Sequence, residues 1–562
     1  MPRILKNINH FFKKKFKDME KEILVSHISA EPLEHVDEYP REQSGCLMNT
    51  TDQFGADPRM YTQDLIPPNV TDTLTGDKYL QELIDTAEQV KQSDEQNSVM
   101  CVGSGSYSQS KLNKYITAVE KFVDNNFPEL LPNSQPYTGE CLNDIMSLIC
   151  SQVTGLCPVL DNSELVHYLL DSYNHHLFSM LHMLMDRSSS VKDSFFLLQW
   201  VKKTFFWQEY KGCFHTHNCV LSVSDPFLLV DWMEYSKQKL LKLLQDNIST
   251  TLYNILQHDV LNVINVDSNE EDFIQVQLDV IQCLNAPIQA SKTVSQSLSN
   301  AVQRLCCDEL HSFIQKYMNV QRADEANLLC NFRTIYTCRQ LRSYALSIID
   351  LNNKTDSSTL LMLEKIESQS LSSTQQCFAF IAKDKLKKYF NKEDAHLCKM
   401  MAIIQCMLAT LPQIEQGQET KQLMVNAAYH SVTRAYLQCL MEKNVKKLEK
   451  RWNDVEKRIM ADAKNFYARF TQENGMDDDQ KMVLLKIAEL LQCRNVDALK
   501  LLCSSLYIIF PKESEEYIPD LLHWRGDLSS RQIKKIINVS REVEDHVRNG
   551  DHTKAHMWCC LC

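Results

Sequence analysis

The sequence contains very little glycine, 12 residues among 562. This is roughly 2%, where a typical soluble protein has about 7%. Tight β-turns and phosphate-binding loops depend on glycine, because glycine alone tolerates a positive φ and a close backbone approach at no steric cost. The shortage therefore argues against a β-sandwich, a β-barrel or a nucleotide-binding α/β enzyme, and it favours long helices.

Proline and long apolar runs are also restricted. Most of the 15 prolines precede residue 140, so few helix breakers follow. The longest apolar run, Met400–Leu411, is shorter than a helix that spans a bilayer. The first 17 residues are basic and lack the apolar core of a secretory signal. We therefore expect a cytoplasmic protein whose 21 cysteines are mostly small buried apolar side chains rather than a disulfide framework.

Helical periodicity dominates from about residue 110 onward. Its clearest example is 421–471, where apolar residues recur at steps of three and four and predict one helix of about 75 Å. A helix of that length needs partners, and similar stripes in other segments favour bundles over a coiled coil. The breaks are too irregular for an ankyrin or HEAT solenoid, and they fall at 187–192, 211–226, 266–271, 351–357, 411–419 and 472–479.

These observations predict an all-α protein, an elongated rod of consecutive helical bundles. The expected domains are a basic amphipathic membrane-binding helix, a flexible linker, N-terminal helical bundles, a middle helical bundle, a C-terminal helical bundle and a cysteine-rich tail. Their expected limits, in that order, are 1–25, 26–76, 77–250, 251–419, 420–548 and 549–562.

The first 20 residues predict a helix that binds an anionic membrane. Apolar side chains recur every four residues, and no acidic residue precedes Asp18. A basic amphipathic helix with aromatic side chains is suited to the headgroup region of an anionic leaflet, although docking on an acidic patch of a protein would use the same features. The residues expected to contact lipid are Arg3, Lys6, Phe11, Phe12, Lys13, Lys14, Lys15, Phe16 and Lys17.

The chain closes on three thiols, Cys559, Cys560 and Cys562. Stable membrane attachment takes two signals, and a lipid on one of these cysteines would supply the second. Cys559 stands where a C-a-a-X box places the prenylated residue, although cysteine is an unusual last residue. The sequence leaves open prenylation, palmitoylation and unmodified thiols.

The other candidate chemistry is weak. Cys213, His215, His217 and Cys219 are possible zinc ligands, but one short segment would have to supply every vertex of the site, so a loop is the better interpretation. The histidines of 175–182 are expected to be solvated or satisfied. We expect no catalytic residue, no metal and no cofactor, and the net charge of −12 argues against nucleic acid as a partner.

The tripeptide Arg525-Gly526-Asp527 has a structural interpretation. Gly526 suits a left-handed helix cap, Asp527 can cap the next helix, and Ser529 with Gln532 has the spacing of a capping box.

Three short segments resemble the exocyst complex component 3 family. They are Ser194–Val201 (SFFLLQWV), Tyr173–His176 (YNHH) and Tyr517–Ser529 (YIPDLLHWRGDLS), within a more diffuse likeness over 78–548. The likeness extends to the exocyst-component-3-like proteins and to M-Sec, also called tumour-necrosis-factor-alpha-induced protein 2, and it implies a rod of stacked helical bundles of the tethering-complex type. Trp524 departs from the smaller aliphatic residue usual in the family.

The resemblance implies a non-enzymatic, membrane-associated tethering scaffold that acts in exocytosis and exocyst localisation. It implies exocyst subunits, SNARE proteins and small GTPases as partners, with an anionic phospholipid membrane, and a role in plasma-membrane protrusion. The expected location is the cytoplasm and the inner face of the plasma membrane. The alternative is a soluble cytosolic helical scaffold that binds no lipid.

Overall fold

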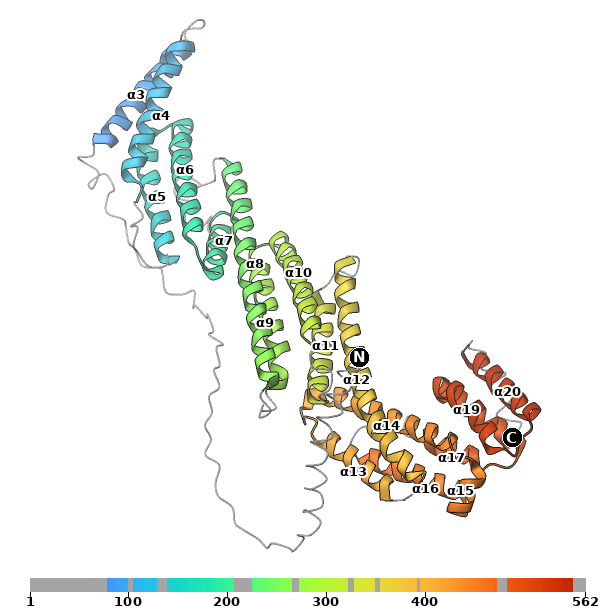
Figure 1. Cartoon of the computed structure of the whole chain (residues 1–562). Coiled ribbons are helices and arrows are strands. Elements are labelled where there is room, and N and C mark those ends of the chain that lie inside the picture. Colours follow the sequence, from blue (N-terminus) through green and yellow to red (C-terminus); the bar gives the residue numbers. More distant parts are fainter. Residues whose placement is uncertain are drawn as a thin grey trace, which may run out of the picture. The chain divides into compact units, whose positions relative to one another are not determined.

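A computed structural model gives the fold. It describes residues 78–99, 105–128, 139–206, 225–264, 272–321, 328–348, 354–391, 395–472 and 483–548. Within these ranges every regular element is a helix and none is a strand (Figure 1), so the predicted all-α class is confirmed. The first helices are α3 (Lys78–Val99), α4 (Gly105–Asn126), α5 (Gly139–Leu160), α6 (Ser163–Arg187) and α7 (Val191–Phe206).

The later helices follow with short connections. They are α8 (Pro226–Ile264), α9 (Asp272–Val294), α10 (Gln296–Gln321), α11 (Leu328–Ile348), α12 (Lys354–Tyr389), α13 (Ala395–Ala409), η2 (Glu415–Gly417), α14 (Gln418–Met441), α15 (Val445–Trp452), α16 (Val455–Gln472), α17 (Val483–Gln492), α18 (Val496–Ile509), α19 (Pro511–Arg525) and α20 (Ser530–Arg548). The breaks predicted near residues 187–192, 351–357 and 411–419 all separate helices here.

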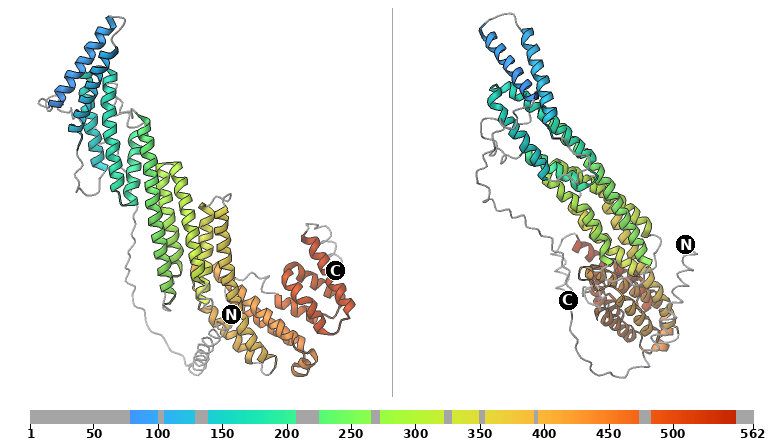
Figure 2. Two further views of the ribbon diagram at one scale, coloured as in Figure 1. Left: turned by 45° about the horizontal axis from the view of Figure 1, so that its top comes forward. Right: turned by 90° about the vertical axis from the view of Figure 1, so that its left-hand side faces the viewer.

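The described residues fall into two compact units. The first contains α3, α4, α5 and the part of α6 that ends at Phe178. Here α3 packs on α4, and the pair lies side by side in both views of Figure 2. The buried Tyr115 hydroxyl of α4 donates to the Leu165 carbonyl over 2.8 Å, and the Tyr173 hydroxyl donates to Gln152 Oε1 over 2.6 Å. These two bonds join α4 and α5 to α6.

The second unit begins at Ser179 and contains the remaining helices. Its pairs include α9 with α10, α11 with α12, α12 with α14, and α18 with α20. Large aromatic side chains fill its core, among them Trp232, Phe332, Phe378 and Tyr436, each less than 2% exposed. Burial of such side chains is the main stabilising contribution in a helical bundle of this kind.

The expected domain limits are finer than this two-part division. The limit between residues 250 and 251 falls inside α8, and the limit between 419 and 420 falls in the first turn of α14. A boundary at either place would cut a continuous helix. The division into bundles otherwise stays a prediction, and 1–25, 26–76 and 549–562 lie outside the described residues.

The prediction of one helix over 421–471 is wrong. The chain bends twice, at Asn444 and at Asn453, and forms three helices. Asn453 has φ 59°, a left-handed value that asparagine tolerates better than most residues. Asp454 Oδ1 then accepts from the Lys457 N–H over 2.9 Å and caps α16. The apolar stripe survives the bends because each short helix turns its own segment of the stripe toward one core.

The corner after α19 follows the prediction for glycine and serine. Gly526 has φ 76° and ψ 2° and ends the helix in the left-handed conformation. The Ser529 N–H donates to Gln532 Oε1 over 2.9 Å, and the Gln532 N–H returns a bond to Ser529 Oγ over 3.4 Å. This is the reciprocal pattern of a capping box at the start of α20.

Candidate functional site

The sites expected at the two ends of the chain lie outside the described residues. This holds for Arg3, Lys6, Phe11, Phe12, Lys13, Lys14, Lys15, Phe16 and Lys17, for Cys559, Cys560 and Cys562, and for the possible zinc ligands Cys213, His215, His217 and Cys219. Within the described part of the chain, no group of three or more histidine, cysteine, aspartate or glutamate side chains is arranged to hold a metal ion. No helix in the same ranges is long and apolar enough to cross a bilayer.

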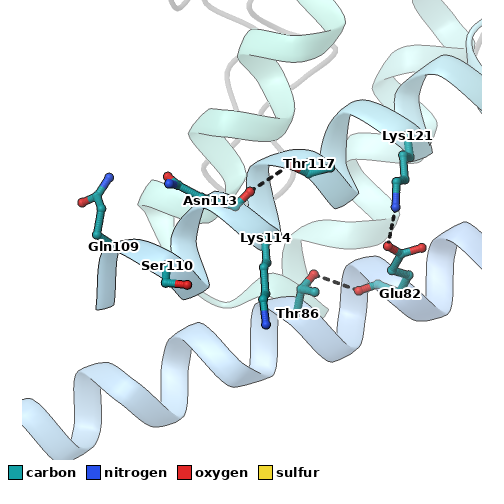
Figure 3. A pocket seen from close by; sticks show the side chains of 8 residues that line it. All are labelled: Glu82, Thr86, Gln109, Ser110, Asn113, Lys114, Thr117 and Lys121. Atoms are coloured by element: carbon teal, nitrogen blue, oxygen red, sulfur yellow. Dashed lines mark hydrogen bonds and ion pairs between the residues drawn. The ribbon is translucent and has the colours of Figure 1, made fainter. Parts of the chain in front are cut away.

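A polar groove runs between α3 and α4 (Figure 3). It is lined by Glu82, Thr86, Gln109, Ser110, Asn113, Lys114, Thr117 and Lys121. Lys121 Nζ pairs with Glu82 Oε1 at 2.8 Å, and the Thr86 hydroxyl donates to the Glu82 carbonyl over 2.8 Å. The Lys121–Glu82 pair joins α4 to α3, and the Thr86 bond lies within α3. The lining brings together no nucleophile with a base, so the groove has no catalytic arrangement.

Two histidines of α6, His176 and His182, contact side chains of other helices. His176 Nε2 lies 2.7 Å from Asp124 Oδ1, and its Nδ1 lies 2.9 Å from the Ser172 carbonyl oxygen. His182 packs its ring against Tyr235, with centroids 4.8 Å apart. Each histidine therefore ties α6 to a neighbour in its own compact unit.

Asp462 of α16 is the centre of a buried polar network that sequence reasoning missed. Its side chain is 5% exposed. Asp462 Oδ2 accepts from the hydroxyls of Tyr389 and Tyr436 over 2.6 and 2.8 Å. The signal was available, because an aspartate among Ile459, Ala463 and Phe466 breaks an otherwise apolar stripe.

A cation completes this network. Arg458 Nε donates to the Tyr389 hydroxyl over 2.9 Å and lies 3.6 Å from Asp462 Oδ1. Burial and the nearby Asp462 carboxylate together raise the pKa of Tyr389 and Tyr436, so both hydroxyls stay protonated as donors. The ring of Trp452 lies 5.6 Å from that of Tyr389 and covers the cluster. The network holds α12, α14 and α16 together.

The Arg525 side chain, 4% exposed, connects the end of α19 to the end of α17. Its Nη1 donates to the Leu490 carbonyl and its Nη2 to the Cys493 carbonyl, each over 2.8 Å. Leu490 lies in the last turn of α17 and Cys493 follows its final residue, so Arg525 binds two carbonyls at the end of that helix, where few backbone partners remain. Arg525 therefore has a structural role, as a cap on a neighbouring helix.

Asp527 does not cap α20, contrary to the sequence-based expectation. Its carboxylate accepts from Arg525 Nη2 over 2.7 Å and from Arg494 Nη1 over 3.0 Å, while Ser529 takes the cap position. Partial burial acts to raise the pKa of Asp527, but the two guanidinium groups outweigh it and the pKa is lowered. Arg494 also pairs with Glu456 at the start of α16.

Trp524, the residue that departs from the family pattern, has a definite partner. Its indole Nε1 donates to the Lys443 carbonyl over 2.7 Å, in the turn between α14 and α15. An aliphatic residue could not make this bond. Trp524 therefore joins α19 to the first of the two bends that interrupt 421–471.

The described cysteines are mostly free thiols in the interior. Cys150, Cys306, Cys338, Cys439 and Cys503 are buried, as expected of small apolar side chains. Cys398 and Cys406 of α13 are exposed.

The fold and its buried networks define the class of this protein as an all-α protein of successive helical bundles, with polar clusters that join helices. Comparisons with known proteins then show what the chain is similar to. Residues 399–530 match the family model of exocyst complex component Sec6. The matched segment contains Asp462, Trp524 and Arg525.

A human exocyst complex component 3-like protein is 23% identical over 382 residues. The match covers 63% of this chain and 50% of the relative, so the chain spans about half the length of the curated relative it matches. The crystal structure of M-Sec has the same fold, with a TM-score of 0.58 over 81% of this chain and 83% of that one, at 13% identity. The family-model match and the curated relative agree with the resemblance to the exocyst complex component 3 family that the three short segments carry.

Proposed function

We propose that this chain is a non-enzymatic tethering scaffold that acts in exocytosis. The observation that supports this most strongly is the Sec6 match over 399–530, which covers α14 and α16 of the buried Asp462 network and the whole Arg525 corner. A scaffold needs surfaces at fixed positions on a rigid core. Buried, fully satisfied polar clusters provide that rigidity, because they specify one packing of the helices.

The proposed partners are other exocyst subunits, SNARE proteins and small GTPases. Support comes from the family, since exocyst subunits work by binding one another. The described helices leave side chains exposed that could contact a partner, including Leu501, Ile508 and Ile509 of α18, each 40–45% exposed. These surfaces belong to a scaffold in our proposal, and none of them contains a catalytic group.

The proposed membrane anchor is the basic segment 1–25. Six basic side chains and three phenylalanines among its first 17 residues would bind and enter an anionic leaflet, placing the protein at the inner face of the plasma membrane. A lipid on Cys559, Cys560 or Cys562 would be the second attachment. In this proposal the same anchoring underlies plasma-membrane protrusion.

Flotation with vesicles tests the anchor. The full chain is compared with one lacking residues 1–20 and with the triple variant Lys13→Glu, Lys14→Glu, Lys15→Glu, using neutral phosphatidylcholine vesicles and the same vesicles with a phosphoinositide. We expect the full chain to float with the anionic vesicles only, and both variants to bind at least about tenfold more weakly, since each basic residue contributes roughly 1 kcal/mol near an anionic surface. Equal behaviour of all three proteins would favour the soluble scaffold instead.

Capture of exocyst subunits tests the scaffold role separately. The full chain, immobilised, is incubated with purified exocyst subunits, and the variant Asp462→Leu is compared at a temperature where its helices remain folded. Retention of at least one subunit by the full chain is expected. A chain that retains none of them, while it still binds vesicles, would contradict the tethering role and leave the membrane anchor standing.

A further inference from the structure

One end of the α12–α14–α15 packing carries a concentration of lysines in a chain of net charge −12. Lys383 and Lys387 lie on the last turns of α12, Lys443 lies in the turn after α14, and the others lie on α15. All but the half-buried Lys443 are exposed. This lysine surface is defined as Lys383, Lys387, Lys443, Lys446, Lys447 and Lys450.

The buried thiol of Cys439, on the last turns of α14, shows that three of these lysines lie close together. Burial, and then the carboxylate of Glu442, raise its pKa, while Lys387, Lys383 and Lys443 act in the opposite direction. All three ammonium groups therefore act on this one thiol from α12 and from the turn after α14. Lys443 Nζ also donates to Asn391 Oδ1 over 3.0 Å, which holds it against the end of α12.

The rest of the lysine surface follows from the bends at Asn444 and Asn453. Leu448 is buried, and Val445 and Trp452 share its face of α15 at steps of three and four. The Trp452 ring packs on Phe390, just past the end of α12, with centroids 5.5 Å apart. With that face held against the core, Lys446, Lys447 and Lys450 are turned to solvent.

These lysines are not neutralised by the protein. None of the six makes an ion pair within 4 Å with any residue of the described ranges, whereas neighbouring Lys388 pairs with Asp384 at 3.2 Å. Glu442 and Glu449 are the other acidic residues on α15 and the turn before it, and they are too few to balance six cations. Like charges held this close repel one another unless an anionic partner is present.

We propose that the lysine surface binds the anionic phospholipid headgroups of a membrane, as a second contact distinct from the N-terminal segment. Lysine is depleted in protein interfaces, and such interfaces need large apolar or aromatic anchors at their centre. Phe380 of α12, 50% exposed and one turn before Lys383, is the one large apolar side chain exposed beside these lysines, and none is exposed on α14 or α15 within the described ranges. A surface of flexible, strongly hydrated ammonium groups fits a layer of headgroups, where each charge contributes independently of exact geometry.

The proposal does not depend on the N-terminal anchor. Variants of the full chain distinguish binding through the lysine surface from binding through the N-terminal segment. The lysine-surface variant is Lys446→Glu, Lys447→Glu, Lys450→Glu. The matched control, Lys114→Glu, Lys242→Glu, Lys316→Glu, changes net charge equally at exposed lysines of α4, α8 and α10. Both variants are made in the natural chain and in a chain that also carries Lys13→Glu, Lys14→Glu, Lys15→Glu. The fraction of protein bound is then measured on phosphatidylcholine vesicles, with and without phosphatidylserine and phosphatidylinositol bisphosphate.

The lysine-surface variant should lower partitioning on anionic vesicles at least about tenfold in both backgrounds, since each lysine near such a surface contributes roughly fivefold. The control should stay within about twofold of its parent, and neutral vesicles should show no difference. A matching Lys→Gln variant, with an unchanged thermal midpoint, shows that the loss is electrostatic and not a failure to fold.

Three results would overturn the proposal. The lysine-surface variant and the control could lose binding equally, which would make net charge the cause. The background with the altered N-terminal segment could show no binding above that to neutral vesicles. Soluble inositol hexakisphosphate or an acidic protein could bind through these lysines while vesicles do not. Loss of binding by the N-terminal variant alone tests only the anchor.

Discussion

Two buried aspartates in the second unit are held in different ways. Asp462 accepts hydrogen bonds from two tyrosine hydroxyls and lies beside Arg458, so its charge is shared among three side chains. Asp259 of α8 is 1% exposed and has one ion-pair partner, Arg333 of α11, which is 8% exposed. Burial raises the pKa of Asp259 more than Arg333 lowers it. A single cation compensates a buried carboxylate less well than a cation with two neutral donors.

The largest expected effect is that of Asp462→Leu. The substitution leaves Tyr389, Tyr436 and Arg458 without their acceptor, so the free energy of unfolding should fall by about 3–5 kcal/mol. Urea unfolding, with hydrogen exchange on α16, measures the loss. Adding Arg458→Met should not restore stability, because both hydroxyls stay unpaired. The exposed Asp520→Leu of α19 is the control, and a loss at Asp462 no larger than at Asp520 would remove the contrast.

Arg333→Met tests the two-member pair. Alone, it leaves Asp259 as an uncompensated buried charge and should cost about 3 kcal/mol of unfolding free energy. Combined with Asp259→Leu, it should recover most of that loss, because hydrophobic replacement of both members of a buried pair is often neutral. Differential scanning calorimetry on the single and double variants gives the coupling. A double variant as unstable as the single would mean that Asp259 has a further partner.

The pH dependence should separate Asp259 from Asp527, because their pKa values are shifted in opposite directions. Asp259 has a raised pKa when folded, so stability relative to Asp259→Asn should decrease as pH rises from about 4 through its folded pKa. Asp527 has a lowered pKa, so its contribution is present above about pH 4 and is lost as pH falls through its folded pKa. Thermal midpoints of wild type and each Asp→Asn variant across this range measure both slopes, and slopes of the same sign would contradict the assignment.

The smallest change in the free energy of unfolding is expected at Asp527, which is more exposed than Asp259 and Asp462. Asp527 is 33% exposed, and Asp527→Ala should cost about 1–2 kcal/mol, because water screens its pair with the exposed Arg494 and because the buried Arg525 keeps its bonds to two carbonyls. Added salt should reduce this cost further, and it should leave the cost of Asp462→Leu nearly unchanged. Urea titrations at low and high salt make the test. If the loss of unfolding free energy on Asp527→Ala did not depend on salt, Asp527 would behave like the buried aspartates.

The sequence predicted most of the helices and their breaks because these depend on local patterns. Gly526 and the Ser529–Gln532 box were predicted from residues within four positions of one another. The continuous helix over 421–471 failed because asparagine is acceptable inside a helix and at a bend, and tertiary packing decides between them. The family was predicted from three short segments, while the ends of the chain, where the expected lipid contacts lie, are outside the described residues.

The buried networks could not be predicted for a different reason. Tyr389 and Asp462 are 73 residues apart, and Trp524 and Lys443 are 81 apart. Only a polar residue within an apolar stripe signalled Asp462, and nothing local indicated its donors. Most lysines of the lysine surface form a charge run that can be read in the sequence. The bends at Asn444 and Asn453 orient that run toward solvent, and they could not be predicted.

The Asp462 network has a consequence for how such a sequence can change over evolutionary time. Replacing the aspartate alone leaves two tyrosines and an arginine with unmet bonds, and replacing either tyrosine alone removes a donor from a buried carboxylate. Any accepted change must therefore alter several members together, by a path through less stable intermediates. In related sequences, Tyr389, Tyr436, Arg458 and Asp462 should be kept or exchanged as one inherited unit.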